Sequence, residues 1–128
     1  MHSLLEQSTW QSKMEDCIFC KIVKGEIPSE KIHENNSFFS ILDQNQEIKG
    51  HALVISNHHA KTILDFPTTL GQELIECLKE TGIKIMKKYN ATGFNVVQNN
   101  FKSSGQEIDH IHFHIIPRSE DDKIPKWF

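Results

Sequence analysis

The amino-acid sequence predicts an α+β domain in which an antiparallel sheet carries a helix on one face. One observation is a single long segment, residues 70–89, in which apolar side chains recur at helical spacing. Another is that short segments rich in β-branched and aromatic residues form two groups, three before this helix and two after it. Strands grouped on either side of one crossover helix favour α+β, and 128 residues are enough for one domain with a hydrophobic core.

The first elements are a short helix and a β-hairpin. Residues 17–28 (CIFCKIVKGEIP) predict the helix, since Gly25 can end it and Pro28 cannot continue it. Residues 31–34 and 37–43 then predict two strands, and the polar residues that join them are typical of a hairpin turn.

A third strand and the long helix come next. Residues 50–56 (GHALVIS) predict the strand. The helix over residues 70–89 is expected to begin with a capping box formed by Thr69 and Gln72. Gly82 is a weak point within the helix because glycine has a low helix propensity.

Two further strands follow the long helix. Residues 93–100 (GFNVVQNN) predict the fourth strand, residues 101–106 (FKSSGQ) a polar turn, and residues 107–117 (EIDHIHFHIIP) the fifth strand. Residues 1–14 are interpreted as an N-terminal extension, either disordered or packed on the body as an amphipathic turn, and residues 15–128 as the domain itself.

The composition excludes several classes of function. A net charge of −3 provides no broad basic face, so binding to nucleic acid is not expected. No apolar run reaches the roughly 18–20 residues that span a bilayer, and the N-terminus lacks the features of a secretory signal, so no membrane association is expected. Three cysteines, two of them in a C-x-x-C pair, favour a metal or redox pair over a disulfide scaffold. These observations predict a cytoplasmic protein.

Three histidines, His110, His112 and His114, alternate with apolar residues in the fifth strand. Side chains two residues apart in a strand point the same way, so the three imidazoles share one face. His110 and His114 then lie roughly 13 Å apart, too far for one metal ion with bonds near 2 Å. Three alternatives remain: a neighbouring pair that binds a metal, one nucleophilic imidazole supported by the others, and a solvated row of histidines.

Four segments together resemble the histidine triad (HIT) family. Residues 110–116 (HIHFHII) match its defining motif. Residues 16–29 (DCIFCKIVKGEIPS), 41–59 (ILDQNQEIKGHALVISNHH) and 93–118 (GFNVVQNNFKSSGQEIDHIHFHIIPR) are similar to successive blocks of its small Hint-like branch. The resemblance implies the HIT-like fold, a five-stranded antiparallel sheet with one long and one short helix, and a homodimer in which two sheets join side by side.

The resemblance also implies a function. In that scheme His112 attacks the α-phosphorus of a purine nucleoside phosphoramidate, an acyl-adenylate or a dinucleoside polyphosphate. Water then releases a nucleoside monophosphate from the nucleotidyl-histidine intermediate, so that one difficult displacement becomes two easier ones. The alternative is a nucleotide-binding or protein-interaction module with little or no turnover.

Carried over residue by residue, the resemblance places the base and the ribose. The apolar slot for the base would be formed by four residues that core packing alone could also explain: Ile18, Phe19, Ile22 and Leu42. Asp43, at the end of the second strand, would accept hydrogen bonds from the two ribose hydroxyls.

The phosphate would be held by a second group of residues. Asn99 would orient the phosphate or the leaving group through its side-chain amide, and His114 would support the phosphate. His51 would stand behind His112, where a core histidine is the other interpretation. The turn before the histidines would offer backbone N–H groups to phosphate oxygens, and its residues are Gly105, Gln106 and Glu107.

The resemblance further implies a structural zinc ion and no organic cofactor. Many members of the branch hold zinc on the C-x-x-C pair together with two histidines, and here the four ligands would be Cys17, Cys20, His59 and His110. Such a Cys₂His₂ set occupies all four coordination positions of a tetrahedral zinc ion, and the site is therefore structural. An inert or redox-active cysteine pair and the replacement of His59 by His58 remain as alternatives.

The sequence departs from the family pattern at two places. Ser56 and Asn57 stand where proline and lysine are usual, which removes a rigid residue and a cation near the zinc ligands. Glu107 stands where the Hint-like hydrolases often carry serine, and an anion beside a phosphate is unfavourable unless it points away. The aromatic residues Trp127 and Phe128 at the C-terminus are expected to pack on the body or across a dimer interface.

Overall fold

The structure is a computed structural model that describes residues 16–125. The helices and strands follow one another as α2 (Ile18–Val23), β1 (His33–Glu34), β2 (Phe38–Leu42), β3 (Ala52–Ser56), α3 (Gly71–Tyr89), β4 (Gly93–Val97) and β5 (His112–Arg118). Short 3-10 turns occupy Ile63–Asp65, Thr68–Leu70 and Lys102–Ser104. The predicted extension over residues 1–14 and the aromatic pair Trp127–Phe128 lie outside the described residues.

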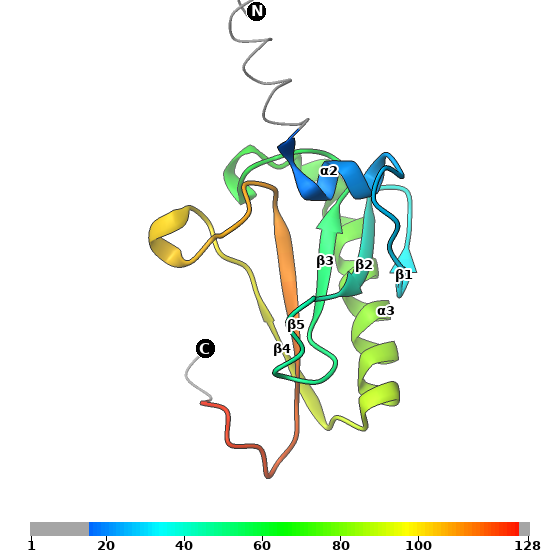
Figure 1. The fold of residues 1–128 in the computed structure, drawn as a ribbon, viewed down its shortest axis with the longest axis vertical. Helices are drawn as coiled ribbons and strands as arrows, with labels where there is room; N and C mark the ends of the chain where they lie inside the picture. Colours follow the sequence, from blue (N-terminus) through cyan, green and yellow to red (C-terminus); the bar gives the residue numbers. More distant parts are fainter. Residues whose placement is uncertain (1–15, 126–128) are drawn as a thin grey trace, which may run out of the picture.

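The five strands form one antiparallel sheet in the order β1-β2-β3-β5-β4. The helix α3 crosses one face of this sheet and α2 lies at the end of the other face (Figure 1). This arrangement confirms the predicted α+β class, with five antiparallel strands, one long helix and one short helix. Within the described residues, no helix is both long enough and apolar enough to cross a membrane.

The two faces of the sheet build two separate hydrophobic clusters, because successive residues of a strand point to opposite sides. In β3, Ala52 and Val54 pack toward α3, whereas Leu53 and Ile55 pack toward α2. In β5, Phe113 and Ile115 join the cluster beneath α3, as the sequence predicts. His112 and His114 are therefore left on the face that carries α2.

The start of α3 differs from the prediction. The helix begins at Gly71 with Leu70 as its N-cap, and no side chain caps it. The predicted capping box of Thr69 and Gln72 is wrong, because Thr69 lies inside the 3-10 turn Thr68–Leu70 that leads into the helix. The structure has a capping box earlier in the chain, at the 3-10 turn Ile63–Asp65.

Gly82 has a packing role that the sequence does not reveal. A Cβ atom at this position would lie 2.7 Å from the ring of Phe94 in β4, so a larger residue would push that ring away. The glycine thus lowers the stability of the helix itself but allows α3 to pack closely against the edge strand β4.

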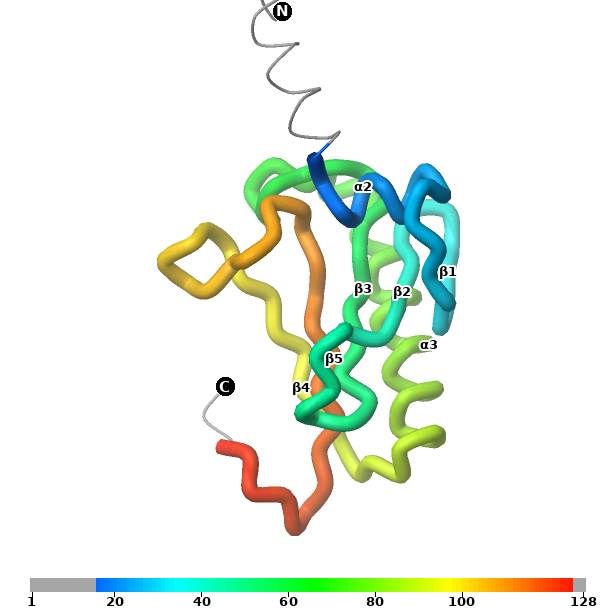
Figure 2. The backbone as a smooth tube through the Cα atoms, viewed as in Figure 1, coloured from blue at the N-terminus to red at the C-terminus, as the bar shows by residue number. Residues whose placement is uncertain are grey.

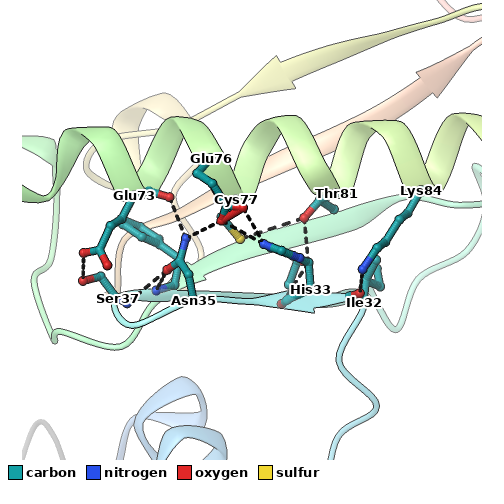
Figure 3. Close-up of polar contacts among 11 residues, drawn as sticks. Ile32, His33, Asn35, Ser37, Glu73, Glu76, Cys77, Thr81 and Lys84 are labelled. Carbon is teal, nitrogen blue, oxygen red and sulfur yellow. Dashed lines mark hydrogen bonds and ion pairs between the residues drawn. The ribbon is translucent and has the colours of Figure 1, made fainter.

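Polar contacts join α3 to the hairpin of β1 and β2 (Figure 3). The fully buried Thr81 hydroxyl donates a hydrogen bond to the Ser40 hydroxyl at 2.7 Å. The Asn35 amide donates to the Glu76 carboxylate at 2.8 Å, and the His33 ring lies at the same distance from that carboxylate. These contacts all lie on the α3 side of the sheet, and they fix the hairpin against the helix.

The fifth strand begins later than predicted. Residues 107–111 form a loop, and β5 begins at His112. A tight turn, in which the His110 N–H donates to the Ile108 carbonyl at 2.8 Å, prevents the strand from starting earlier. The Ile111 N–H donates to the carbonyl of Ala60 instead of to a neighbouring strand. Figure 2 shows this β4–β5 connection reaching the end of the sheet where α2 lies.

Candidate functional site

A cavity of about 480 Å³ opens on the α2 face of the sheet. Residues of β3 and β5 line it, together with residues of α2, the β2–β3 connection and the β4–β5 loop. The lining residues are Ile18, Phe19, Ile22, Ile41, Leu42, Asp43, Gln44, Asn45, His51, Leu53, Asn99, Gly105, Glu107, Ile108, His112 and His114. Every residue that the sequence predicts for nucleotide binding is in this set except Gln106.

Sequence reasoning missed five residues of the cavity wall, and these are Ile41, Gln44, Asn45, Leu53 and Ile108. A usable signal existed for Leu53, which follows His51 by two residues in a predicted strand and therefore shares its face. The other four become visible only once the two loops are placed against α2 and β5.

The His112 ring has a defined tautomer. Its Nδ1 lies 2.8 Å from the carbonyl oxygen of His110, and because a carbonyl only accepts, Nδ1 carries the proton. The Nε2 atom is then left with its lone pair, as a nucleophile requires. The ring is buried, and Phe19 of α2 packs edge-on against it at a centroid distance of 5.3 Å.

His51 lies beside His114 instead of behind His112. The Nε2 atom of His51 is 2.9 Å from Nδ1 of His114 and 3.7 Å from a carboxylate oxygen of Asp43. The register explains this placement, because Leu53 faces His114 across β3 and β5 and His51 is on the same face two residues earlier.

Both imidazoles of this pair are held neutral. Burial, assisted by the neighbouring His112 and His51 rings, lowers the pKa of His114 to about 4. Burial also lowers the pKa of His51, against the opposing attraction of Asp43. At neutral pH one ring therefore donates a single N–H to the other.

The side chain of Gln106 points into its own loop and not into the cavity. Its Oε1 accepts from the Phe101 N–H at 2.6 Å, and its Nε2 donates to the carbonyls of Lys61 and Ile108 at 2.6 and 3.0 Å. Gln106 is 5% exposed and ties the β4–β5 loop to the segment after β3. Its side chain therefore holds the loop, whereas the sequence predicts only a backbone N–H of this residue as a ligand contact.

Fewer backbone N–H groups of this loop are available to a ligand than the sequence predicts. The Gly105 N–H donates to the carbonyl of Lys102 and the Gln106 N–H to the carbonyl of Phe101, so both are used within the loop. Among the described residues, the Glu107 N–H has no hydrogen-bond partner. Two of the three backbone donors that the sequence predicts for a ligand are therefore used inside the loop.

The Asn99 amide lies in the cavity wall beside Gly105, and its side chain makes no hydrogen bond within residues 16–125. Two other asparagines of this region have hydrogen-bond partners within the protein. Asn100 accepts from the Ile63 N–H at 2.9 Å, and Asn95 accepts from Arg118 at 2.8 Å. Asn99 is thus the asparagine of this region that a ligand can use.

A second group of residues, Cys17, Cys20, His59 and His110, gathers between α2, the end of β3 and the start of β5. Each offers one ligand atom, and these atoms all lie within 4.8 Å of one another. The four residues that supply these atoms are the ones predicted from the family pattern, whereas His58 is exposed and does not belong to the group.

The distances in this group approach those of a tetrahedral zinc ion, and two of the three are slightly shorter than its edges, so the side chains would move apart a little to bind it. Sulfur–nitrogen distances are 3.3 Å for Cys17 and His110 and 3.1 Å for Cys20 and His59, and the two Nδ1 atoms are 3.1 Å apart. Zinc bonds of about 2.0–2.3 Å span edges of roughly 3.3–3.8 Å. The Ser56 carbonyl accepts from Nε2 of His110 at 2.6 Å, which turns the Nδ1 lone pair toward the cysteines.

The third cysteine, Cys77, is fully buried in α3 and lies far from this group, against Thr81. Burial raises the pKa of its thiol to about 11. The structure contains no disulfide among the three cysteines. Cys77 therefore acts as a small core residue, as predicted.

Comparison with known proteins decides the family. A family model described as the HIT domain matches residues 24–121. An uncharacterised HIT-like protein of Methanocaldococcus jannaschii is 42% identical over 106 residues, which cover 83% of this chain and 81% of that protein. The chain belongs to the HIT family. This confirms the family resemblance and, with it, the HIT-like fold.

Two further HIT relatives bear on the site. The adenosine 5′-monophosphoramidase of Saccharomyces cerevisiae is 38% identical over 105 residues, covering 82% of this chain and 64% of that protein. The crystal structure of a zinc-bound histidine triad family protein from Mycobacterium smegmatis has a TM-score of 0.80 and 31% identity, covering 88% of this chain and 82% of that chain.

Proposed function

We propose that this HIT protein hydrolyses purine nucleotides at the α-phosphorus through a nucleotidyl-histidine intermediate on His112. The observation that carries the proposal is the tautomer of His112, whose Nδ1 proton is held by a carbonyl while Nε2 keeps its lone pair within the cavity. Support comes from relatives named as an adenosine 5′-monophosphoramidase and, in Arabidopsis thaliana, as an adenylylsulfatase. The ligand is a nucleotide of the AMP type and not a nucleic acid.

The cavity has matching surfaces for the parts of such a nucleotide. Ile18 and Leu42 line the cavity and are 39% and 36% exposed, and exposed apolar groups in a cavity wall are typical of a binding slot for a flat base. The Asp43 carboxylate lines the same cavity, 3.7 Å from His51, and accepts from the ribose hydroxyls in this proposal. His114 and Asn99 then contact the phosphate.

Two displacements complete the proposed reaction. The Nε2 lone pair of His112 forms a bond to phosphorus, and the bond from phosphorus to the leaving nitrogen or oxygen breaks with its electron pair, which takes up a proton from solvent. Water then attacks the same phosphorus and loses a proton to solvent, and the bond between phosphorus and Nε2 breaks with its electron pair. The lone pair of His112 is restored, and a nucleoside monophosphate is released.

The test is hydrolysis of an adenosine phosphoramidate to AMP. His112→Ala is expected to lower kcat by roughly a thousandfold or more, because the nucleophile is lost, while AMP still binds. His33→Gln is the matched control, since His33 lies on the α3 face and contacts Glu76. Turnover by the His112→Ala protein at the wild-type rate would refute the proposal. Tight AMP binding without turnover of any nucleotide substrate would instead favour the binding-module alternative.

The proposal includes one structural zinc ion on Cys17, Cys20, His59 and His110. When bound, zinc would tie α2, which lines the cavity, to the start of β5. Burial and the neighbouring Cys17 raise the pKa of the Cys20 thiol to about 12. Zinc uptake at pH 7.5 should therefore release protons.

Metal analysis of freshly purified protein decides the zinc question. We expect about one zinc per chain, little zinc in the Cys17→Ser protein, and a full complement in Cys77→Ser as the control. A stable wild-type protein without zinc would contradict this assignment. A zinc-bound cysteine pair would also fit the prediction of a cytoplasmic location, where cysteines stay reduced.

The predicted homodimer would form through β4, which is an edge of the sheet. Phe94 and Val96 on this strand are 37% and 45% exposed, and an apolar edge strand is a ready surface for pairing with a second copy. Val96→Lys is expected to shift the protein toward monomer in sedimentation experiments, whereas Leu64→Lys, at a residue 80% exposed elsewhere, is not. An unchanged distribution in Val96→Lys would count against this interface.

A further inference from the structure

A second potential metal-ligand group lies inside the cavity, apart from the cysteines. It consists of Asp43, His51 and His114, whose ligand atoms all lie within 4.8 Å of one another. We propose that these three residues form an exchangeable binding site for a divalent transition-metal ion, and that an ion bound there excludes nucleotide. The metal site itself follows from this geometry alone, whereas the exclusion rests on the proposed function.

The distances between the ligand atoms suit one metal ion. The Nε2 atom of His51 lies 2.9 Å from Nδ1 of His114 and 3.7 Å from the nearer carboxylate oxygen of Asp43. With bonds of about 2.1 Å, these separations correspond to angles of about 90° and about 120° at the metal. Both angles are ordinary for an ion with four to six ligands.

The backbone around the three residues already holds them in place. The Asp43 N–H donates to the His51 carbonyl at 2.9 Å, which continues the pairing of β2 with β3. The Gln46 amide donates to the carbonyls of both Asp43 and His51, at 2.8 and 2.9 Å. His114 is fixed by its place in β5 opposite Leu53. The ligand set is therefore preorganised, which lowers the entropy lost on binding.

The chemistry of the set selects the kind of ion. Two imidazole nitrogens and one carboxylate oxygen suit zinc, cobalt, nickel or copper, whereas magnesium and calcium prefer oxygen alone. Both nitrogens can bind one ion once the proton that they share moves to the far nitrogen of its ring. The cavity leaves the remaining coordination positions to water.

An ion at this site would occupy two contacts that the nucleotide needs. Asp43 is the proposed acceptor for the ribose hydroxyls, and His114 is the proposed support for the phosphate. A metal ion uses the carboxylate oxygen and the Nδ1 lone pair, and its bound water fills the space between the base slot and His112. Metal and AMP should therefore bind in competition.

The test is a titration with Co²⁺ of protein whose zinc content has been measured first. Binding is followed by calorimetry, and visible absorption distinguishes the two kinds of site, because thiolate ligands give charge-transfer bands that an N₂O site lacks. We expect a Co²⁺ equivalent without thiolate absorption. His51→Gln and Asp43→Asn should each weaken it by roughly tenfold or more, and AMP should weaken it in the wild-type protein.

His33→Gln is the matched control, because His33 and Glu76 form another histidine–carboxylate contact, on the α3 side of the sheet. Loss of the Co²⁺ equivalent in His33→Gln, its persistence in both cavity variants, or its absence from the wild-type protein would overturn the site. Co²⁺ and AMP binding together without interference would overturn the exclusion. If Co²⁺ binds and AMP fails to bind the metal-free protein, the nucleotide proposal fails while the metal site stands.

Discussion

The loop that borders the cavity should depend on one buried side chain, that of Gln106. Replacing Gln106 by glutamate keeps the shape of the side chain and removes only its two N–H donors. Oε1 can still accept from the Phe101 N–H, whereas the other oxygen would face the carbonyls of Lys61 and Ile108. The substitution therefore changes hydrogen bonding and charge without creating a cavity.

The expected loss of stability follows from these contacts. Two hydrogen bonds worth about 1 kcal/mol each are lost, and a buried carboxylate facing carbonyl oxygens adds a further cost of about 1 kcal/mol. We expect the free energy of unfolding to fall by about 3 kcal/mol at pH 7.5, which corresponds to a melting temperature lower by about 10 °C in a domain of this size.

The stability of the Gln106→Glu protein should also depend on pH in a defined direction. Burial should raise the pKa of Glu at position 106 in the folded protein above its value in the unfolded chain. The folded variant then binds a proton that the unfolded chain releases, so its stability falls as the pH rises through that interval. The difference from wild type should be smaller at pH 5 than at pH 7.5, because a protonated carboxyl regains one donor.

Urea unfolding at the two pH values measures the effect, and AMP binding shows whether the loop still supports the cavity. Gln72→Glu is the matched control, since it makes the same change at an exposed position in the first turn of α3, where it should be nearly neutral. A Gln106→Glu protein with the wild-type urea midpoint at pH 7.5 would refute the role assigned to this side chain.

Two further predictions concern the region around the cavity. Gly50 has φ +89°, and a Cβ there would lie 2.7 Å from the Tyr89 ring, so Gly50→Ala should lower the free energy of unfolding by about 2 kcal/mol or more. Gly71→Ala should not, because Gly71 has φ −61° and a Cβ there would have no atom within 4 Å. Equal urea midpoints for the two variants would contradict this. The pKa of His114 is lowered to about 4 from 6.5, so the unfolded chain binds this proton first and stability should fall as the pH drops from 6.5 toward 4. Urea midpoints over this range should fall less steeply in His114→Gln, and an identical slope would contradict the assignment.

The sequence predicts those parts of the site that depend on local spacing. The two-residue period of β5 places His112 and His114 opposite Phe113 and Ile115, and the structure confirms this division of faces. The residues that we propose for the base slot also follow from the sequence, because the family pattern names them and the structure gathers them around one cavity.

The remaining parts depend on contacts between distant segments. The predicted capping role of Thr69 is wrong because helix propensity and the hydrophobic pattern do not reveal the 3-10 turn before the helix. The partner of His51 is set by the register of β3 with β5, which no spacing within a single strand specifies. The side chain of Gln106 reaches the carbonyl of Lys61, which lies 45 residues earlier, so its structural role is visible only in the folded chain.

The late start of β5 explains how three alternating histidines acquire three different surroundings. His110 precedes the strand, so its ring reaches Cys17 and Cys20 while its carbonyl oxygen points to Nδ1 of His112. His114, four residues further on, meets His51 at the other end of the cavity. One residue, His110, therefore contacts the cysteines through its side chain and fixes the tautomer of His112 through its backbone. Because both functions belong to the same short turn, a change that displaces His110 from the cysteines would also disturb the nitrogen that we propose as the nucleophile.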